Sequence, residues 1–335
     1  MVTVYDVADA VGLSIASVSR ALNGQPGVSP ATSEKIRVAA ESLGYQPNEV
    51  ARSLVAKSTQ TIALLLPDIT NPFFPELVEG VQLVVDQEEH VLFLSNRAMN
   101  SEKVSHDVSV LRRKQVDGLI VVAGTFTDQV EDAVFSGIPT VFLDRSSASP
   151  GTLSVGVDHE AAAYDAVRHL LSLGHTKIAH IAGPRSLAVA QQREAGWRRA
   201  LTEAGLAASP ALVAPGDFTE EGGQAAIRAL FERGHEFTAV FAANDLSAIG
   251  VLAHCAQNSI SVPDDLSVIG FDGIQLSRYT TPMLTTVAQP IVELGIAAGE
   301  LLLDAVRGAA IAEPRITLPT QLVLGQSAQM IGNAR

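Results

Sequence analysis

The hydrophobic residues at the start of the chain repeat with the period of an α-helix. They fall three and four residues apart, at Val4, Val7, Ala8 and Val11. Thr3 and Asp6 have the spacing of a capping box, which begins a helix. Gly12 follows where a tight turn needs a residue that tolerates a positive φ. We therefore expect a short helix that ends in a turn at Gly12.

A second apolar pattern begins directly after this turn. Ser14 is placed to cap a second helix, since serine is a favoured N-cap. The apolar face of that helix consists of Val18, Ala21 and Leu22. Ala8, Gly12 and Val18 have the spacing of a helix-turn-helix, whose second helix enters the DNA major groove. An ordinary pair of amphipathic helices would show the same periodicity, so this pattern alone leaves both interpretations open.

A third helix is predicted to begin at Ser29-Pro30, an N-cap followed by proline at the first helical position. It ends at Gly44, and three helices in the first 44 residues make a minimal DNA-binding head. After Pro47, Asn48 can cap a helix over EVARSLVA that has barely two turns. Because so short a helix is marginal in water, we expect it to be a linker when the protein is not bound to DNA.

From Thr61 the pattern changes to short apolar strands that alternate with helices. In the first series, strands are expected at 61–66, 91–94, 118–122 and 140–143, and helices at 74–89, 102–114 and 129–136. In the second, helices are expected at 159–173, 187–204, 220–233 and 246–257, and strands at 177–182, 237–242 and 267–271. Such alternation predicts two similar α/β units with buried parallel sheets. Residues 284–306 should cross back to the first unit, and a last strand around 316–324 should return to the second.

Polar and aromatic residues gather where the predicted strands end. They are Phe73, Asp144, Arg145, Asn244, Asp245 and Asp272, with Arg193 on the helix after 177–182. Ligands of open α/β sheets bind beyond these carboxyl ends, and polar groups beside an aromatic wall suit a sugar. Each residue also has a simpler interpretation: Asp144–Arg145 as a surface pair, Asn244 and Asp245 as helix caps, and Phe73 as core. Their recurrence at one edge favours a binding site.

Charge is distributed unevenly along the chain. The net charge is −13, which is unusual for a protein that binds nucleic acid. Residues 1–60 contain five acidic and five basic residues and are neutral, so the other 275 residues carry all of the negative charge. A neutral head on an acidic body predicts weak non-specific DNA binding and a reliance on dimerisation.

Several other classes of protein lack support in the sequence. There is no phosphate-binding loop, no GxSxG, no HExxH and no paired metal-ligand spacing, so we expect neither an enzyme nor a cofactor. No apolar run is long enough for a membrane span, and MVTVYDV has no features of an export signal. The single cysteine, Cys255, lies among apolar residues and is expected to be a buried thiol in a cytoplasmic protein.

Longer motifs resemble the lactose/galactose repressor (LacI/GalR) family across nearly the whole chain and in the same order. In the head they are VTVYDVADAVGLSIASVSRALNG, VSPAT, LGYQPN and ARSL. In the core they are LLLPDITNPFF, LDR, HIAGP, REAGW, AAND, SVPDDLSVIGFD and LTTVAQP. The resemblance implies a helix-turn-helix head and two doubly wound, periplasmic-binding-protein-like lobes.

The resemblance also implies three functional segments. Residues 1–45 would be the head, 46–60 a hinge helix and linker, and 61–335 the core. Lobe one would be about 61–158 plus 288–315, and lobe two about 159–287 plus 316–330. The DNA-binding residues would be Thr3, Tyr5, Ser14, Ile15, Ala16, Ser17, Ser19, Arg20, Asn23, Ser29, Thr32, Asn48, Ala51, Arg52 and Leu54. Ile15, Ala16 and Arg20 would read bases, and Leu54 would insert into the minor groove as an apolar wedge.

By the same resemblance, the chain is a cytoplasmic homodimeric transcription regulator, a repressor that binds a near-palindromic operator. A sugar-like effector would lie between the lobes, at Asn71, Phe73, Asp144, Arg145, Arg193, Asn244 and Asp272. The main alternative, a solute-binding protein of a sugar transporter, predicts an export signal and no DNA head. A cytoplasmic sugar enzyme is a third hypothesis, for which the sequence offers no site.

Three departures from the family pattern change the expectation. Ser33 stands where many members have arginine, so we expect weaker operator affinity. Gly325 replaces the usual arginine near the end, which removes a polar contact. No heptad pattern follows Ser327, so the tail that makes the lactose repressor a tetramer is missing, and a dimer is predicted.

Overall fold

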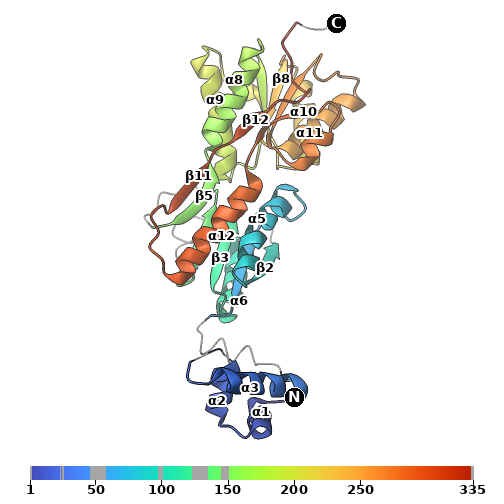
Figure 1. Cartoon of the computed structure of the whole chain (residues 1–335). Coiled ribbons are helices and arrows are strands. Elements are labelled where there is room, and N and C mark those ends of the chain that lie inside the picture. Colours follow the sequence, from blue (N-terminus) through green and yellow to red (C-terminus); the bar gives the residue numbers. More distant parts are fainter. Residues whose placement is uncertain are drawn as a thin grey trace. The chain divides into compact units, whose positions relative to one another are not determined.

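The computed structural model describes residues 2–22, 24, 26–45, 58–96, 101–122, 135–144 and 151–332. The chain forms two compact units, Met1–Thr59 and Gln60–Arg335 (Figure 1). The hinge helix predicted between them, with Asn48, Ala51, Arg52 and Leu54, lies outside the described residues. So do Asn23, Arg145 and most of the helix predicted at 129–136.

The first unit contains the three predicted helices, α1 (Val4–Val11), α2 (Ile15–Leu22) and α3 (Pro30–Leu43). The Asp6 carboxylate accepts hydrogen bonds from the Thr3 backbone N–H (2.7 Å) and Oγ1 (2.8 Å), which begins α1. Gly12 and Gly44 end α1 and α3 with φ of 70° and 67°, which glycine adopts without strain. A small core joins the three helices, built on Val7, Ala8, Val11, Val18, Ile36 and Ala40.

The first lobe of the second unit is a six-stranded sheet in which every strand is parallel to its neighbours. Its order is β11-β5-β4-β3-β1-β2, with bounds Arg315–Leu318, Leu153–Val157, Thr140–Leu143, Gly118–Val122, Thr61–Leu66 and Val91–Asn96. Alternate residues of a strand face opposite sides. Ile62, Leu64 and Leu66 therefore pack under α5 (Phe73–Gln87) and α12 (Ile291–Arg307), while Ala63 and Leu65 pack under α6 (Ser101–Arg113).

The second lobe repeats this arrangement with one antiparallel strand. Its order is β12-β10-β9-β8-β6-β7, with bounds Gln321–Val323, Thr285–Ala288, Ser267–Asp272, Ala239–Ala242, Ile178–Ala182 and Val213–Pro215. One face carries α8 (His159–Ser172) and α9 (Ala188–Glu203), and the other carries α10 (Glu220–Glu232) and α11 (Asp245–Gln257). Two 3-10 helices, η1 (Pro210–Leu212) and η2 (Gln275–Tyr279), complete the described elements. The predicted fold class is confirmed.

The strand predicted at 316–324 was wrong as a single element. Residues Arg315–Leu318 form β11 in the first sheet, and Gln321–Val323 form β12 in the second, with two residues between them. The chain therefore crosses to the second lobe after Leu318, not before Ile316. Strands β5 and β7 were also missed. Gly156 interrupts the apolar pattern of β5, and β7 has only three residues and ends in Pro215.

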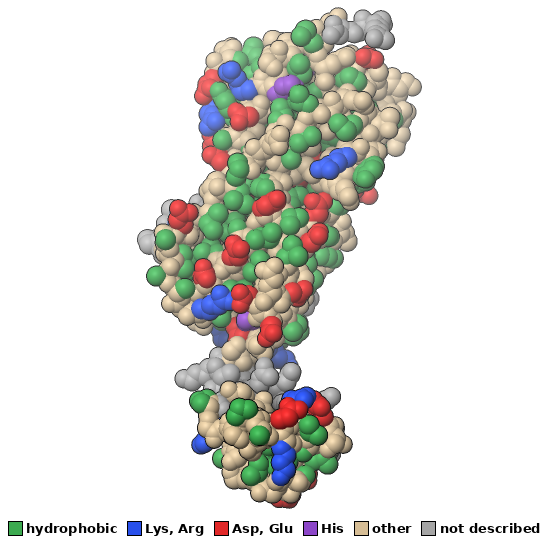
Figure 2. All heavy atoms as spheres, in the orientation of Figure 1, with side chains coloured by type: hydrophobic (Ala, Val, Ile, Leu, Met, Phe, Trp, Pro, Cys, Tyr) green, Lys and Arg blue, Asp and Glu red, His purple; other side chains and the backbone are tan. Residues whose placement is uncertain are grey.

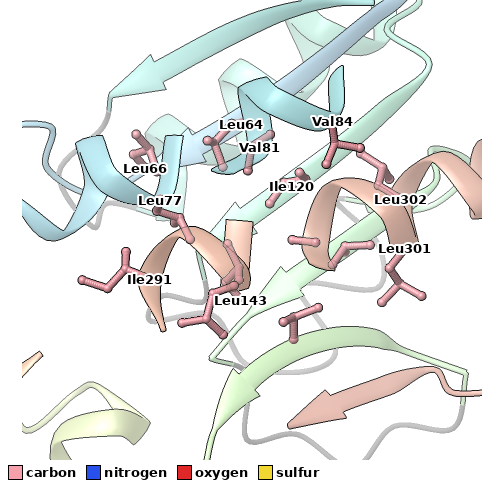
Figure 3. Close-up of a cluster of buried hydrophobic side chains, with 14 of the residues drawn as sticks. Leu64, Leu66, Leu77, Val81, Val84, Ile120, Leu143, Ile291, Leu301 and Leu302 are labelled. Atoms are coloured by element: carbon pink, nitrogen blue, oxygen red, sulfur yellow. The ribbon is translucent and has the colours of Figure 1, made fainter. Parts of the chain in front are cut away.

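Glycines bring α5 and α12 into backbone contact. A Cβ on Gly80 would collide with the Val292 carbonyl oxygen, and one on Gly295 would lie 2.8 Å from the Val81 backbone nitrogen. The close approach lets leucine, isoleucine and valine side chains of both helices meet over the sheet (Figure 3). Among the described residues, no helix is long and apolar enough to cross a membrane.

Gly295→Val should lower the free energy of unfolding of the core by about 1–3 kcal/mol, because the added methyl groups force the two helices apart. The melting temperature of the core should fall by roughly 2–4 °C for each kcal/mol. Glu293→Val places the same residue at an exposed position of α12 and is the matched control. Equal melting temperatures for the two variants in scanning calorimetry would show that the helices are not held by backbone contact.

Candidate functional site

The first candidate surface is the exposed N-terminal half of α2 in the head. Ser14 caps this helix, because its Oγ accepts a hydrogen bond from the Ser17 backbone N–H at 3.2 Å. The two serine hydroxyls also lie 2.9 Å apart. Ile15 is 41% exposed and Ala16 is exposed, although both begin a helix whose opposite face is core. An apolar side chain held in solvent at a helix start is placed to meet a partner's surface.

Arg20 differs from the other described basic residues of the head. Lys35 Nζ donates to the Val11 carbonyl oxygen at 3.2 Å, and Arg37 pairs with Glu34 and Glu41 at 2.7 and 2.5 Å. Arg20 is exposed in the last turn of α2 and pairs with no described acid. Its guanidinium is therefore available to an external acceptor.

The other predicted head residues that are described lie around the same helix starts. Tyr5 is 62% exposed on α1, and Thr3 is exposed at its N-cap. Ser29 caps α3 by accepting from the Thr32 backbone N–H at 3.2 Å, and the two hydroxyls lie 2.8 Å apart. Ser19 is half-buried. The hydroxyl groups of Thr3, Ser14 and Ser29 thus make contacts at the starts of α1, α2 and α3, and these contacts fix where each helix begins.

The second candidate site lies at the carboxyl ends of the core strands, around the buried side chain of Arg193. Arg193 comes from α9 and is 4% exposed. Its Nη1 lies 3.2 Å from Asp272 Oδ1 and donates to the Ala243 carbonyl oxygen at 2.5 Å. Its guanidinium carbon lies 3.8 Å from the ring centroid of Phe271 and 5.7 Å from that of Phe218. Arg193 and Asp272, both predicted from the sequence to bind the effector, thus lie side by side in the second lobe.

Further polar side chains surround this pair. Gln289 Nε2 donates to Asp272 Oδ1 at 2.8 Å, while its Oε1 is buried without a partner among the described residues. His159 Nδ1 accepts from Arg193 Nε at 3.3 Å, and His159 Nε2 lies 3.0 Å from Oδ1 of Asp144. Asp144 follows β4 in the first lobe, whereas the other residues belong to the second. The network therefore spans both lobes.

Two residues of this network were missed as site residues from the sequence. Neither His159 nor Gln289 was among the site residues predicted from the sequence. The signal available was position: Gln289 directly follows β10 and His159 directly follows β5, both at the strand ends where the other site residues lie. Because β5 itself was not predicted, the position of His159 could not be recognised.

The structure places three predicted residues in structural roles. Asn244 caps α11, since its Oδ1 accepts from the Ser247 backbone N–H at 3.0 Å and its Nδ2 donates to the Phe218 carbonyl oxygen at 3.0 Å. Asn71 Oδ1 likewise accepts from the Phe73 backbone N–H at 3.0 Å. Phe73 is 8% exposed and packs in the first-lobe core, edge-on to Phe74. These contacts agree with the simpler interpretations, in which Phe73 is a core residue and Asn244 is a helix cap.

Burial and neighbouring charges together set the pKa values of the acidic groups. It raises the pKa of Asp272, which the nearby Arg193 opposes. Burial and the charge of Asp272 together raise the pKa of Asp245 well above its usual value. Burial also pushes the Asp144 pKa upward, but His159 and Arg193 together outweigh it and hold that pKa below the ordinary value. Arg193 itself has its pKa lowered by burial, against the attraction of Asp272 and Asp144.

Asp245 holds the loop after β9, and part of this loop packs against the first lobe. Its Oδ2 accepts from the backbone N–H groups of Gly273 and Ile274 at 2.9 and 3.0 Å, and its Oδ1 accepts from Thr286 Oγ1 at 2.5 Å. Ile274 packs in the first-lobe core, although it belongs to the second lobe. Asp245 is thus a structural residue that fixes the loop after β9, the strand that ends at Asp272 with a φ of 114°.

Other expectations concern residues away from the site. Trp197 is fully buried, and its indole N–H donates to the Ile178 carbonyl oxygen at 3.2 Å, so it packs α9 against the second sheet. Cys255 is buried, which raises the pKa of its thiol to about 11. Gly325 leaves no room for a side chain here, because a Cβ would lie 2.6 Å from the Leu284 carbonyl. No group of metal-binding side chains occurs among the residues that the structure describes.

Known proteins with related sequences and structures share this organisation. Residues 3–48 match the model for bacterial regulatory proteins of the lacI family, and residues 167–328 match that for a periplasmic binding protein-like domain. Catabolite control protein A of Priestia megaterium is 36% identical over 97% of this chain and 99% of its own.

Two solved structures are similar over nearly the whole chain. A lac repressor dimer bound to operator and the anti-inducer ONPF is 31% identical, with a TM-score of 0.89 over 98% of this chain and 99% of that one. A complex of the transcriptional regulator CelR with cellobiose is 30% identical, with a TM-score of 0.75 over 98% of this chain and 100% of that one. With its helix-turn-helix head and two-lobed α/β core, the chain belongs to the lacI family of bacterial regulatory proteins.

Proposed function

We propose that this chain is a transcriptional repressor whose affinity for an operator is set by a small molecule bound between the core lobes. The observation that supports the proposal is that two different features occur together in one chain. The head presents Arg20, which pairs with no acid among the described residues, and exposed Ile15 on one helix, and the core holds a buried polar network across two lobes. A solute-binding protein would need only the second of these.

The segments have separate roles in this proposal. Residues 1–45 read the operator, 46–60 form the hinge, and 61–335 bind the effector and the second subunit. The lobe boundary follows the strands, so lobe one includes β11 and its last crossover is after Leu318. The hinge residues Asn48, Ala51, Arg52 and Leu54 are proposed to contact the minor groove. Support comes from the similar lac repressor dimer, whose structure contains operator DNA.

Direct reading of bases is assigned to Ile15, Ala16 and Arg20. Arginine pairs with guanine through two hydrogen bonds, and short apolar side chains contact thymine methyl groups. The capping hydroxyls of Ser14 and Ser29 mark helix N-termini, where backbone N–H groups favour phosphate. Tyr5, Thr3, Ser17, Ser19, Asn23 and Thr32 complete the proposed DNA-binding set.

The effector is proposed to be an uncharged sugar or a related polyol that engages Arg193 and Asp272. Neither Arg193 Nη2 nor Asp272 Oδ2 has a described hydrogen-bond partner, so one donor and one acceptor are available to a hydroxyl group. The described acids near Arg193 are Asp144, Asp245 and Asp272, against one guanidinium. A phosphate would have to compete with the Asp272 and Asp144 carboxyl groups for this single guanidinium. The proposed pocket is surrounded by Asn71, Phe73, Arg145 and Asn244.

The second subunit is proposed to cover the edge of the first sheet. β2 ends that sheet, and Val91, Phe93 and Leu94 are 57%, 48% and 50% exposed. Leu83 on α5 is 48% exposed. Figure 2 shows hydrophobic side chains across the face of the first lobe that carries α5, β2 and α12. An exposed apolar edge strand requires a partner, and the similar lac repressor structure is a dimer. A cytoplasmic location is part of the same proposal.

The direct test of the proposed function is selection of bound duplexes from a random-sequence DNA library by the full chain. The proposal predicts enrichment of one sequence with two-fold symmetry, because a symmetric dimer presents two recognition helices. Failure to enrich any sequence would contradict it.

On the selected duplex, Arg20→Ala should weaken binding by about 1–3 kcal/mol, or roughly 5- to 150-fold, and relax the preference at one base of each half-site. Arg37→Ala removes a basic residue that already pairs with Glu34 and Glu41, and should bind almost as the wild type does. Fluorescence anisotropy titrations measure both. An equal loss in the two variants would indicate general charge, not base reading.

Phe93→Lys should convert the dimer to a monomer, because it places a charge on the proposed apolar interface. Phe231→Lys is the matched control on the second lobe, where Phe231 is 37% exposed. Light scattering coupled to size-exclusion chromatography gives the molecular mass. A dimeric Phe93→Lys protein would place the interface elsewhere.

Neutral sugars should stabilise the core more than their phosphate esters do. We expect this order in thermal-shift assays that pair ribose with ribose 5-phosphate, glucose with glucose 6-phosphate, and cellobiose with its phosphate. A ligand at 100 times its Kd adds about 2.7 kcal/mol of stability. Stabilisation by an ester but not by its parent sugar would refute the charge argument.

A further inference from the structure

We infer that His159 is a positioning residue that links Arg193 in the second lobe to Asp144 in the first. The inference builds on the proposed effector role of Arg193, but the link between the lobes consists of contacts within the chain itself. Its consequence is that any change at Arg193 alters how firmly the first lobe is held.

The protonation of His159 follows from its two neighbours. An arginine Nε always carries a hydrogen, so the 3.3 Å contact from Arg193 requires His159 Nδ1 to accept. The proton of the neutral ring then lies on Nε2, which is 3.0 Å from Asp144 Oδ1. Both of these atoms are shielded from solvent and have no other partner among the described residues. Each nitrogen of His159 thus serves a different lobe.

The surroundings hold the ring in this orientation. His159 is 2% exposed and its ring lies 5.7 Å from that of Phe271, which also underlies the Arg193 guanidinium. Its backbone is the first residue of α8, which Asp158 caps by accepting from the Ala161 N–H at 2.9 Å. The imidazole is therefore fixed from the second lobe, and Asp144 is the group that can move away.

The first lobe is shaped to present Asp144. Its backbone has a φ of 54°, in the left-handed region that costs free energy for residues other than glycine. A Cβ on Gly156 would lie 2.9 Å from Asp144 Oδ1, so glycine at that position leaves space for the carboxylate. The Asp144 backbone N–H donates to the Val155 carbonyl oxygen at 3.0 Å, which anchors the residue to the first sheet.

The lobes also meet at a second place, which limits how far His159 can act. The Gln275 backbone N–H donates to Glu76 at 3.2 Å, and Leu246 and Ile274 of the second lobe pack in the first-lobe core. Loss of the contact between His159 and Asp144 should therefore move the lobes apart on the side of this contact without separating them. A measurable change in lobe separation, with a retained fold, is the expected signature.

Substitutions can remove one of the two contacts of His159 at a time. His159→Asn keeps an acceptor near the Nδ1 position and loses the reach to Asp144. His159→Gln places an amide N–H near the Nε2 position and keeps that reach. Asp144→Gly removes the same contact from the other lobe, at a backbone φ that glycine favours.

The test is a distance measurement between spin labels on the two lobes of the full chain. Labels go on Cys introduced at exposed Asp304 of α12 and exposed Glu232 of α10, with Cys255 replaced by alanine. Labelled protein is diluted with excess unlabelled protein, so that only distances within one subunit are recorded. Melting curves of all variants confirm that they fold.

The expected result is a narrow distance distribution for the wild type and His159→Gln, and a broader one shifted to longer distances for His159→Asn and Asp144→Gly. Arg193→Lys, which lacks the Nε–H donor, should broaden it as well. Equal distributions in the wild type and His159→Asn, or equal broadening by His159→Gln and His159→Asn, would overturn the link. A narrow distribution for Arg193→Lys would refute the part that Arg193 plays in it. None of these outcomes depends on whether the chain binds DNA.

Discussion

A positive charge buried in the second lobe is the constraint around which the core is arranged. Arg193 is 4% exposed, and an isolated buried charge costs several kcal/mol unless other groups compensate it. Asp272, the Ala243 carbonyl oxygen and His159 supply that compensation, and Phe271 covers the guanidinium face. Each of these groups comes from the end of a strand or the start of a helix. Because these groups all belong to the second lobe, the carboxyl ends of its strands must keep their arrangement for the buried charge of Arg193 to stay compensated.

This requirement explains several features that are otherwise unrelated. Asp272 and Asp144 both adopt positive φ at the ends of strands in opposite lobes, and their carboxylates contact Arg193 and His159 respectively. Asp245 fixes the loop after β9 by accepting two backbone N–H groups and the Thr286 hydroxyl. A Cβ on Gly270 would collide with the carboxylate of Asp245, so a small residue is needed there. The polar network and the glycines that make room for it form one structural unit.

Local signals in the sequence predicted most of the architecture. The capping of α1 and α3, the turn at Gly12 and the long apolar strands depend on residues close together in the chain, and the structure confirms them. The prediction failed for strands that form only because they pair with segments distant in the sequence. Strand β5 depends on pairing with β4 and β11, and the crossover between β11 and β12 divides a continuous β-rich stretch between two sheets. For the site, Arg193 with Asp272 was predicted through family resemblance. His159 and Gln289 were not, because their importance comes from neighbours distant in sequence.

The central claim is that Arg193 is the group through which a small molecule is recognised. The most direct measurement is mass spectrometry of the compounds that the full chain retains after equilibration with a metabolite extract and gel filtration. Arg193→Lys keeps the charge but loses the planar fork of donors, so it serves as the comparison. The account predicts that the wild type retains an uncharged polyhydroxylated compound that Arg193→Lys does not. Retention of the same compound by both proteins, or of a phosphorylated compound by the wild type, would contradict it.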